Sequence, residues 1–143
     1  MKAMADRKAL IGSLRSGDIF HAQAPNGASM ICLVLSVSDA GIRARRVTTQ
    51  EELEFDRMTG QAMVGDQGLV CVIDSVVPLP ADIHDVFLAM DEKNRALMAM
   101  DEKARFEDFE RLKLTGPEKN ALTFVHSHYT SNPLPPPEAS EKT

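Results

Sequence analysis

The chain has 143 residues, of which 43% are hydrophobic and 26% charged, a composition typical of a globular protein. This length fits one domain with appendages, and such a domain can bury a core without disulfides or metals. The formal net charge is −5, and neither half of the chain is the polycation that strong non-specific binding to nucleic acid requires.

The N-terminal segment, residues 1–15, is predicted to form a short helix. Its apolar residues Leu10, Ile11 and Leu14 would lie on one side, and a helix this short is stable only when that side docks. Charged residues stand where a signal peptide would have its apolar centre, and no run reaches the roughly 20 apolar residues that cross a bilayer. We therefore expect a cytoplasmic protein without membrane contact.

Residues 16–79 carry the strand signals. Ser29–Ser38 has a continuous apolar centre between two turn clusters, which predicts a central strand covered on both faces. Other strands are predicted at 19–24, 42–47, 52–56, 61–64 and 69–77. The tight turns between them leave no room for crossover helices, so the sheet must be mostly antiparallel. Closure into a small barrel, SH3-like or similar, would hide its edges.

Segments 42–47 and 52–56 are predicted to form a half-buried hairpin with one apolar face and one charged face. With a loop at 48–51, Arg46 falls on the apolar face, so either it lies at the edge with its stem buried and its charged end in water, or this register is wrong. The expected cross-strand pairs are Val47 with Glu52, Arg45 with Glu54, Ala44 with Phe55, and Arg43 with Asp56.

A helical extension is predicted over residues 80–130. Asp82 is the expected N-cap, and no Pro or Gly follows until Gly116, so one long helix or two abutting helices should occupy 83–114. Apolar residues gather on one side of the first half, which should pack on the barrel or on a partner. The second half should break, bend or project.

A capping box predicts one more helix. Thr115 and Glu118 have the Thr-x-x-Glu spacing, and the helix should run to about Tyr129. The last segment, residues 131–143, has four prolines and mainly polar residues otherwise, which predicts a disordered tail. The predicted fold class is thus α+β, a small antiparallel β-barrel followed by a C-terminal helical extension.

No motif predicts a catalytic, cofactor-binding or metal-binding residue. His126 and His128 are two residues apart and would point to different sides of a helix, and the chain has no Cys-x-x-Cys or His-x-x-x-His. Glycine-rich phosphate loops and the Gly-x-Ser-x-Gly motif are also missing from the sequence. Cys32 and Cys71 lie in apolar runs and are predicted to be buried free thiols.

Gly17-Asp18-Ile19 is predicted to open a strand, and Leu33-Val34-Leu35-Ser36 lies in the central one. The first stretch resembles a strand opening in the MazF/PemK-like toxins, small barrels that cut RNA, and the second is similar to their second strand. Where their pattern places Arg-Pro ahead of the second strand, this chain has Met30-Ile31. The resemblance therefore extends to the style of a small barrel, and it implies no catalytic residue here.

Two surfaces are candidates for binding. The first is the strand with Arg43, Arg45 and Arg46, which could contact nucleic acid, and Arg46 is the best candidate because it has no assigned acidic partner. The second is a protein interface on the helical extension, at Phe87, Met90, Leu97, Met98 and Met100.

The sequence favours a non-enzymatic adaptor that contacts a protein partner, or a second copy of itself, through residues 82–129. A nucleic-acid-binding barrel is the alternative, and a small hydrolase or nuclease without a recognisable motif is third.

Overall fold

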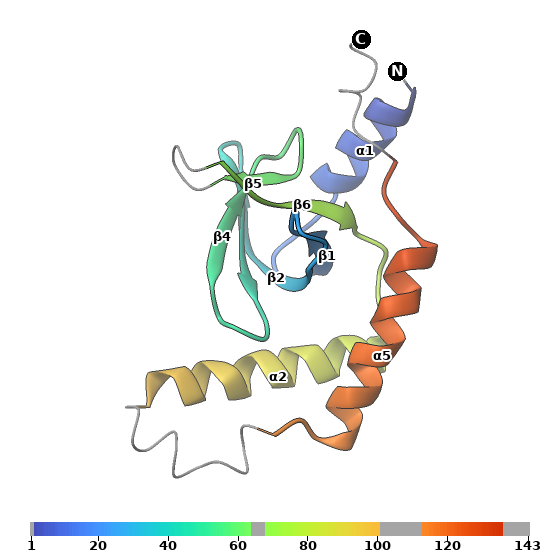
Figure 1. Ribbon diagram of the computed structural model, residues 1–143. Helices are drawn as coiled ribbons and strands as arrows, with labels where there is room; N and C mark the ends of the chain where they lie inside the picture. The colour runs from blue at the N-terminus through green and yellow to red at the C-terminus, as the bar shows by residue number, and fades with distance from the viewer. Residues whose placement is uncertain (1, 64–67, 101–112, 136–143) are drawn as a thin grey trace.

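The computed structural model describes residues 2–63, 68–100 and 113–135 (Figure 1). The elements in chain order are helix α1 (Lys2–Gly12), strands β1 (Ile19–Gln23), β2 (Ser29–Ser38), β3 (Gly41–Arg46), β4 (Glu52–Phe55), β5 (Gln61–Met63) and β6 (Leu69–Ser75), and helices α2 (Ala81–Ala99) and α5 (Gly116–Ser131). The strands close into one barrel in which each pairs with its neighbours in sequence and β1 pairs with β6, all antiparallel. The predicted α+β class, a barrel followed by helices, is confirmed.

Strand β2 lies between two hydrophobic cores, as its unbroken apolar centre predicts. Cys32 and Val34 point into the barrel, where the rings of Phe20 and Phe55 meet edge to face with centroids 5.1 Å apart. Leu33 belongs to a second core on the outside of the barrel. We call these two clusters the barrel core and the outer core. Residues of the outer core come from the barrel surface and from both C-terminal helices, and the buried ones are Ile19, Leu33, Val47, Phe87, Met90, Ala121, Val125 and Tyr129.

The β3–β4 hairpin differs from the predicted register by two residues. Arg43 pairs with Glu54 and Arg45 with Glu52. The turn is earlier than expected because Val47 leaves the hairpin, donates its backbone N–H to Ile31 of β2 at 2.9 Å, and buries its side chain in the outer core. A shift of two residues keeps every side chain on the same face of a strand, so the predicted charged and apolar faces are retained.

Helix α2 crosses below the barrel and is joined there by α5 (Figure 1). Its N-cap is Pro80, without a side-chain hydrogen bond, so the prediction of Asp82 as the cap is wrong. The helix ends at Ala99, where Met100 turns to an extended conformation, which confirms a break within the predicted 83–114 helix. The rest of that segment, 101–112, lies outside the described residues.

The capping box of α5 is present as predicted. The Thr115 hydroxyl accepts from the Glu118 N–H at 3.2 Å, and the Glu118 carboxylate accepts from the Thr115 N–H at 2.9 Å. Within the described ranges, no helix has the length and apolar character needed to span a membrane.

The described end of the chain is packed against the barrel, whereas the sequence predicts disorder from residue 131. Leu134 is buried in the barrel core, and its N–H donates to the Asp74 carbonyl of β6 at 2.7 Å. The Ser75 hydroxyl donates to the Asn132 carbonyl at 2.7 Å, which ties the same segment to the end of β6. The burial of Leu134 and these two hydrogen bonds together hold 132–135, and the remaining 136–143 lie outside the described residues.

Helix α1 covers one end of the barrel. Of the three residues predicted to share one side, Ile11 and Leu14 are buried in the barrel core, while Leu10 keeps 41% of its surface exposed. Arg7 is also buried, and its guanidinium donates to three carbonyls from separate parts of the chain: Thr59 at 2.8 Å, Ile73 at 3.0 Å and Pro135 at 3.3 Å.

Gly60 has no side chain, and this leaves the space in which α1 approaches the barrel. It has φ +76°, and an added Cβ would lie 3.0 Å from Ile11 Cδ1 and 3.1 Å from Arg7 Nη2. Gly27 has φ +91° with open space around it, so a side chain added there would strain the backbone but would meet no neighbouring atom.

We expect Gly60→Ala to lower the free energy of unfolding by about 2–4 kcal/mol, because left-handed strain adds to displacement of α1. Gly27→Ala should cost only about 1–2 kcal/mol from strain. Urea unfolding of both variants measures the difference, and equal losses would show that α1 does not press on Gly60.

Candidate functional site

The three predicted arginines are each ion-paired within the chain. Arg43 contacts Glu52 at 2.7 Å on the exposed face of the hairpin, and Arg46 contacts Glu51 at 3.2 Å. Arg46 therefore has an acidic partner, and the reason for choosing it as the best nucleic-acid contact is wrong. The register explains the error, because it brings the loop residue Glu51 to the end of β3.

Arg45 is part of a half-buried polar cluster that docks α2 on the hairpin. Its Nε and Nη2 donate to the two carboxylate oxygens of Asp91 at 3.0 and 2.7 Å. Gln50 donates to the same carboxylate at 2.9 Å, and Asn94 of α2 donates to the Val47 carbonyl at 2.9 Å. We call these residues the Asp91 clamp. The clamp orients α2, because it joins this helix to the hairpin at fixed points. Arg45 and Asp91 satisfy each other in this pair, so neither charged group is available to an external ligand.

A second ion pair joins the two C-terminal helices. Lys93 of α2 contacts Glu118 at 2.8 Å, so the capping residue of α5 also binds α2. Burial alone would raise the pKa of Glu118, but the hydrogen bond from Lys93 and the bonds to Thr115 outweigh it and lower the pKa. For Asp91, burial is likewise outweighed by the hydrogen bonds from Arg45 and Gln50, and its pKa is lowered.

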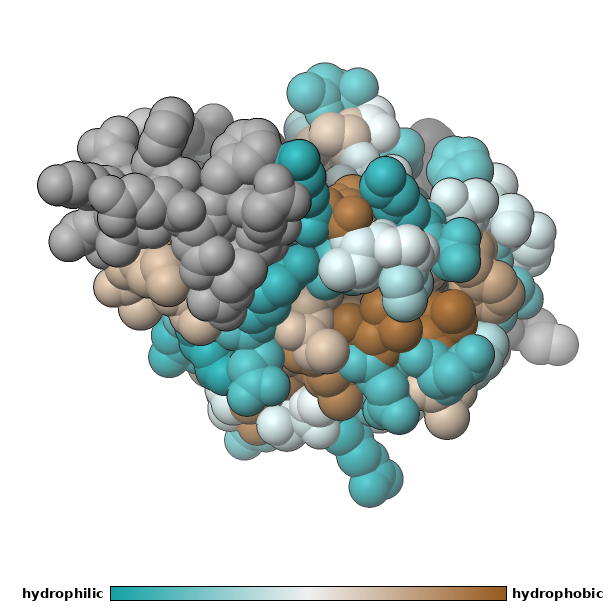
Figure 2. Space-filling view, turned by 90° about the horizontal axis from the view of Figure 1, so that it is seen from below, coloured by the Kyte–Doolittle hydropathy of each residue, from teal (hydrophilic) through white to brown (hydrophobic). Residues whose placement is uncertain are grey.

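Most of the predicted helical interface is used inside the molecule. Phe87, Met90 and Leu97 are at most 2% exposed, whereas Met98 is 55% exposed and Met100 is half-buried. Hydrophobic side chains do reach the surface of this face, between polar ones (Figure 2). Half-buried residues of α2, α5 and the segments beside them pack on the outer core, namely Val77, Leu79, Ile83, Val86, Leu122 and Phe124. The apolar side of α2, from which the sequence predicts a partner interface, is thus largely used to dock α2 on its own barrel.

The two cysteines are free and buried, as predicted. Burial raises the pKa of Cys32 far above its ordinary value and that of Cys71 to about 11, so both stay protonated and unreactive at neutral pH. Among the described residues, no three His, Cys, Asp or Glu side chains gather as metal ligands do.

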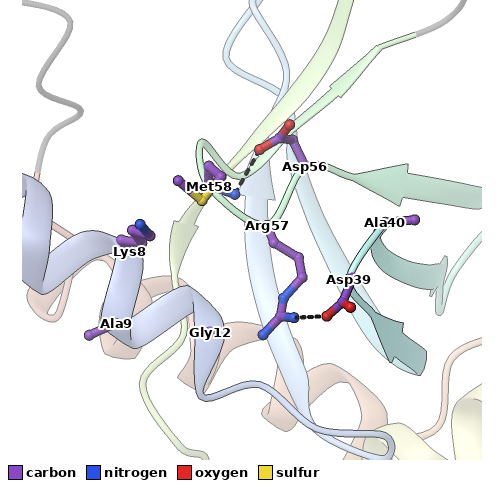
Figure 3. Close-up of a pocket in the computed structure, with 8 residues that line it drawn as sticks. All are labelled: Lys8, Ala9, Gly12, Asp39, Ala40, Asp56, Arg57 and Met58. Carbon is purple, nitrogen blue, oxygen red and sulfur yellow. Dashed lines mark hydrogen bonds and ion pairs between the residues drawn. The ribbon is translucent and has the colours of Figure 1, made fainter.

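A hollow lies where α1 meets two turns of the barrel (Figure 3). It has a volume of about 560 Å³, within the range of ligand-binding sites. We call it the α1 hollow, and it is lined by Lys8, Ala9 and Gly12 of α1, Asp39 and Ala40 of the β2–β3 turn, and Asp56, Arg57 and Met58 of the β4–β5 turn.

Arg57 reaches across the α1 hollow toward Asp39 (Figure 3). Gly12 lies beside it, and a Cβ added there would make an ordinary van der Waals contact with Arg57 Nη2, at 3.9 Å. Among the described residues, the guanidinium makes one hydrogen bond, to the Ser38 carbonyl at 3.3 Å, and its ion pair with Asp39 is long, at 3.8 Å. Asp39 is fully exposed, so water screens this pair and it contributes little.

The other acidic group of the α1 hollow has a structural role. Asp56 accepts from the backbone N–H groups of Met58 and Thr59 at 2.7 and 3.0 Å, which fixes the turn that carries Arg57. Met58 itself is 54% exposed at the rim. A weakly held arginine beside Lys8 and an exposed methionine is an arrangement that can take a carboxylate together with an apolar group.

No sequence motif contains Lys8, Asp39 and Arg57. They meet because α1 and two turns lie at the same end of the barrel, and their separation in sequence gives no local signal. Comparisons of the chain with models of protein families, with curated proteins and with solved structures found no match.

The lowered pKa values of Asp91 and Glu118 predict acid sensitivity. Both groups stabilise the fold fully above about pH 4, the ordinary carboxyl pKa, and this contribution is lost as pH falls through their lower folded values. Asp91→Asn should cost roughly 3 kcal/mol at pH 7 and flatten the decline below pH 4.

Urea unfolding midpoints between pH 7 and pH 2.5 measure this dependence. Glu54→Gln changes an exposed carboxylate on the same hairpin and should leave the profile unchanged. The same acid profile in Asp91→Asn and in the unmodified chain would contradict the assignment.

Proposed function

We propose that this protein is a cytoplasmic, non-enzymatic adaptor that binds a segment of a partner protein in the α1 hollow. The observation that carries the proposal is Arg57, whose guanidinium has one hydrogen bond and one long, exposed ion pair to the part of the chain that the structure describes. A partner carboxylate could make two short parallel hydrogen bonds to it and displace Asp39 at little cost. Met58 at the rim favours an apolar residue beside the acidic one.

The site differs from the one that the sequence favours. An interface on residues 82–129 depends on Phe87, Met90 and Leu97, and their burial within the chain supports the α1 hollow instead. The arginines of β3 have internal partners, so no observation favours nucleic acid over a protein partner.

Selection of a displayed library of random seven-residue peptides on the full chain, with counter-selection on Arg57→Gln, tests the proposal. We expect the enriched peptides to pair an acidic residue with an adjacent apolar one. Titration calorimetry with one of them should show binding weakened about tenfold or more by Arg57→Gln, because a charge-assisted hydrogen bond is lost.

Two further variants sharpen the result. Asp39→Asn removes the internal competitor for Arg57 and should tighten binding, a direction that damage to the fold would not produce. Arg43→Gln makes the same charge change on β3, outside the α1 hollow, and should have no effect. Equal weakening by Arg43→Gln and Arg57→Gln, or enrichment of peptides without acidic residues, would contradict a carboxylate site at Arg57.

A further inference from the structure

A histidine and an aspartate form a hydrogen-bonded pair on the outside of the barrel, away from the α1 hollow. His21 of β1 contacts Asp74 of β6 through Nδ1 and Oδ1 at 2.5 Å, and its side chain is only 13% exposed. The imidazole packs against the ring of Tyr129 from α5, with centroids 5.1 Å apart. The ring is therefore fixed from two sides.

A β-bulge places the aspartate. The register between β1 and β6 shifts between His21 and Ala22, so that His21 pairs with Ser75 while Ala22 pairs with Ile73, and Asp74 is the extra residue. Bulges redirect side chains and are frequent beside functional sites. The same bulge exposes the Asp74 carbonyl that binds Leu134, so the carboxylate and the backbone of Asp74 are both held.

The pair determines which nitrogen of His21 can act on a ligand. Because a carboxylate only accepts hydrogen bonds, the proton of the neutral imidazole stays on Nδ1, and Nε2 presents its lone pair. In the described part of the chain, Nε2 has no hydrogen-bond partner. Tyr129 beside it keeps a buried hydroxyl that is also without a partner among these residues. A buried polar group without a partner, as the Tyr129 hydroxyl is here, is uncommon in folded proteins and calls for a physical reason.

His21 lines a small pocket between the barrel and α5. Its volume is about 170 Å³, close to that of the roughly 150 Å³ cavity that holds one benzene molecule. The pocket combines apolar side chains from β2 and α5 with polar ones, and besides His21 it is lined by Ser29, Ile31, Thr48, Leu122, Val125 and His126.

We propose that this pocket binds a small organic molecule with a compact apolar body, of the size of one aromatic ring, and one O–H group. The O–H donates to Nε2 of His21, and the apolar body packs on Ile31, Leu122 and Val125. Asp74 is a positioning residue, because it acts on the ligand only through the tautomer and orientation of His21. The inference does not depend on the α1 hollow.

Phenol is the probe, and anisole, which has no O–H, is its matched control. Both are titrated into the full chain while NMR follows the imidazole nitrogens of His21 and the methyl groups of Leu122 and Val125. We expect phenol to shift the Nε2 resonance and to bind about fivefold more tightly than anisole, as one hydrogen bond predicts.

Two variants test the role of the imidazole. His21→Phe keeps a ring against Tyr129 and should bind phenol and anisole equally, while His84→Ala changes a histidine of α2 outside the pocket and should keep the preference for phenol. Equal affinity for the two probes in the unmodified chain, or shifts in the methyl groups without any at Nε2, would overturn the proposal whether or not His21→Phe folds.

Discussion

Strand β2 is apolar on both faces, and the rest of the chain is arranged to cover both. The barrel closes over one face and buries Cys32 and Val34. The other face, with Leu33, lies outside the barrel and would meet water if the chain ended at β6. Helices α2 and α5 cover it, so the extension is a required part of the fold. A barrel without it would expose a hydrophobic surface of the kind that leads to association.

Ion pairs determine how the helices sit on this face, because hydrophobic contacts alone allow many orientations. The Asp91 clamp holds α2 to the β3–β4 hairpin, and the Lys93 to Glu118 pair holds α5 to α2. Buried polar pairs contribute little net stability compared with apolar packing, but they penalise every arrangement in which they are left unpaired. The hydrophobic contacts thus hold the helices against the barrel, and the ion pairs determine their orientation on it.

The features that the sequence predicts correctly are those with a local signal. The apolar run of β2 is bounded by turns on both sides, and its ends are found to the residue. The capping box of α5 depends on two residues three positions apart, Thr115 and Glu118. The order of the strands follows from tight turns, which permit only antiparallel neighbours.

The features that the sequence misses depend on contacts between distant residues. The hairpin register changes because Val47 binds Ile31 of another strand, and no pattern within the hairpin records that contact. The position of α2 depends on the bond between Asp91 and Arg45, two residues that lie 46 positions apart in the sequence. Leu134 stands among prolines, where composition predicts disorder, and it packs because the bulge at Asp74 offers a carbonyl. The α1 hollow and the His21 pocket are likewise assembled from separate segments.

Because Leu134 fills part of the barrel core, the barrel reaches its final packing only when synthesis has passed Leu134. The hydrogen bond from Arg7 to Pro135 joins residues 128 positions apart, and such contacts form late because closing a long loop costs entropy. A nascent chain that has released only its strands therefore has an incompletely covered core. At that stage the protein is most exposed to aggregation on the ribosome.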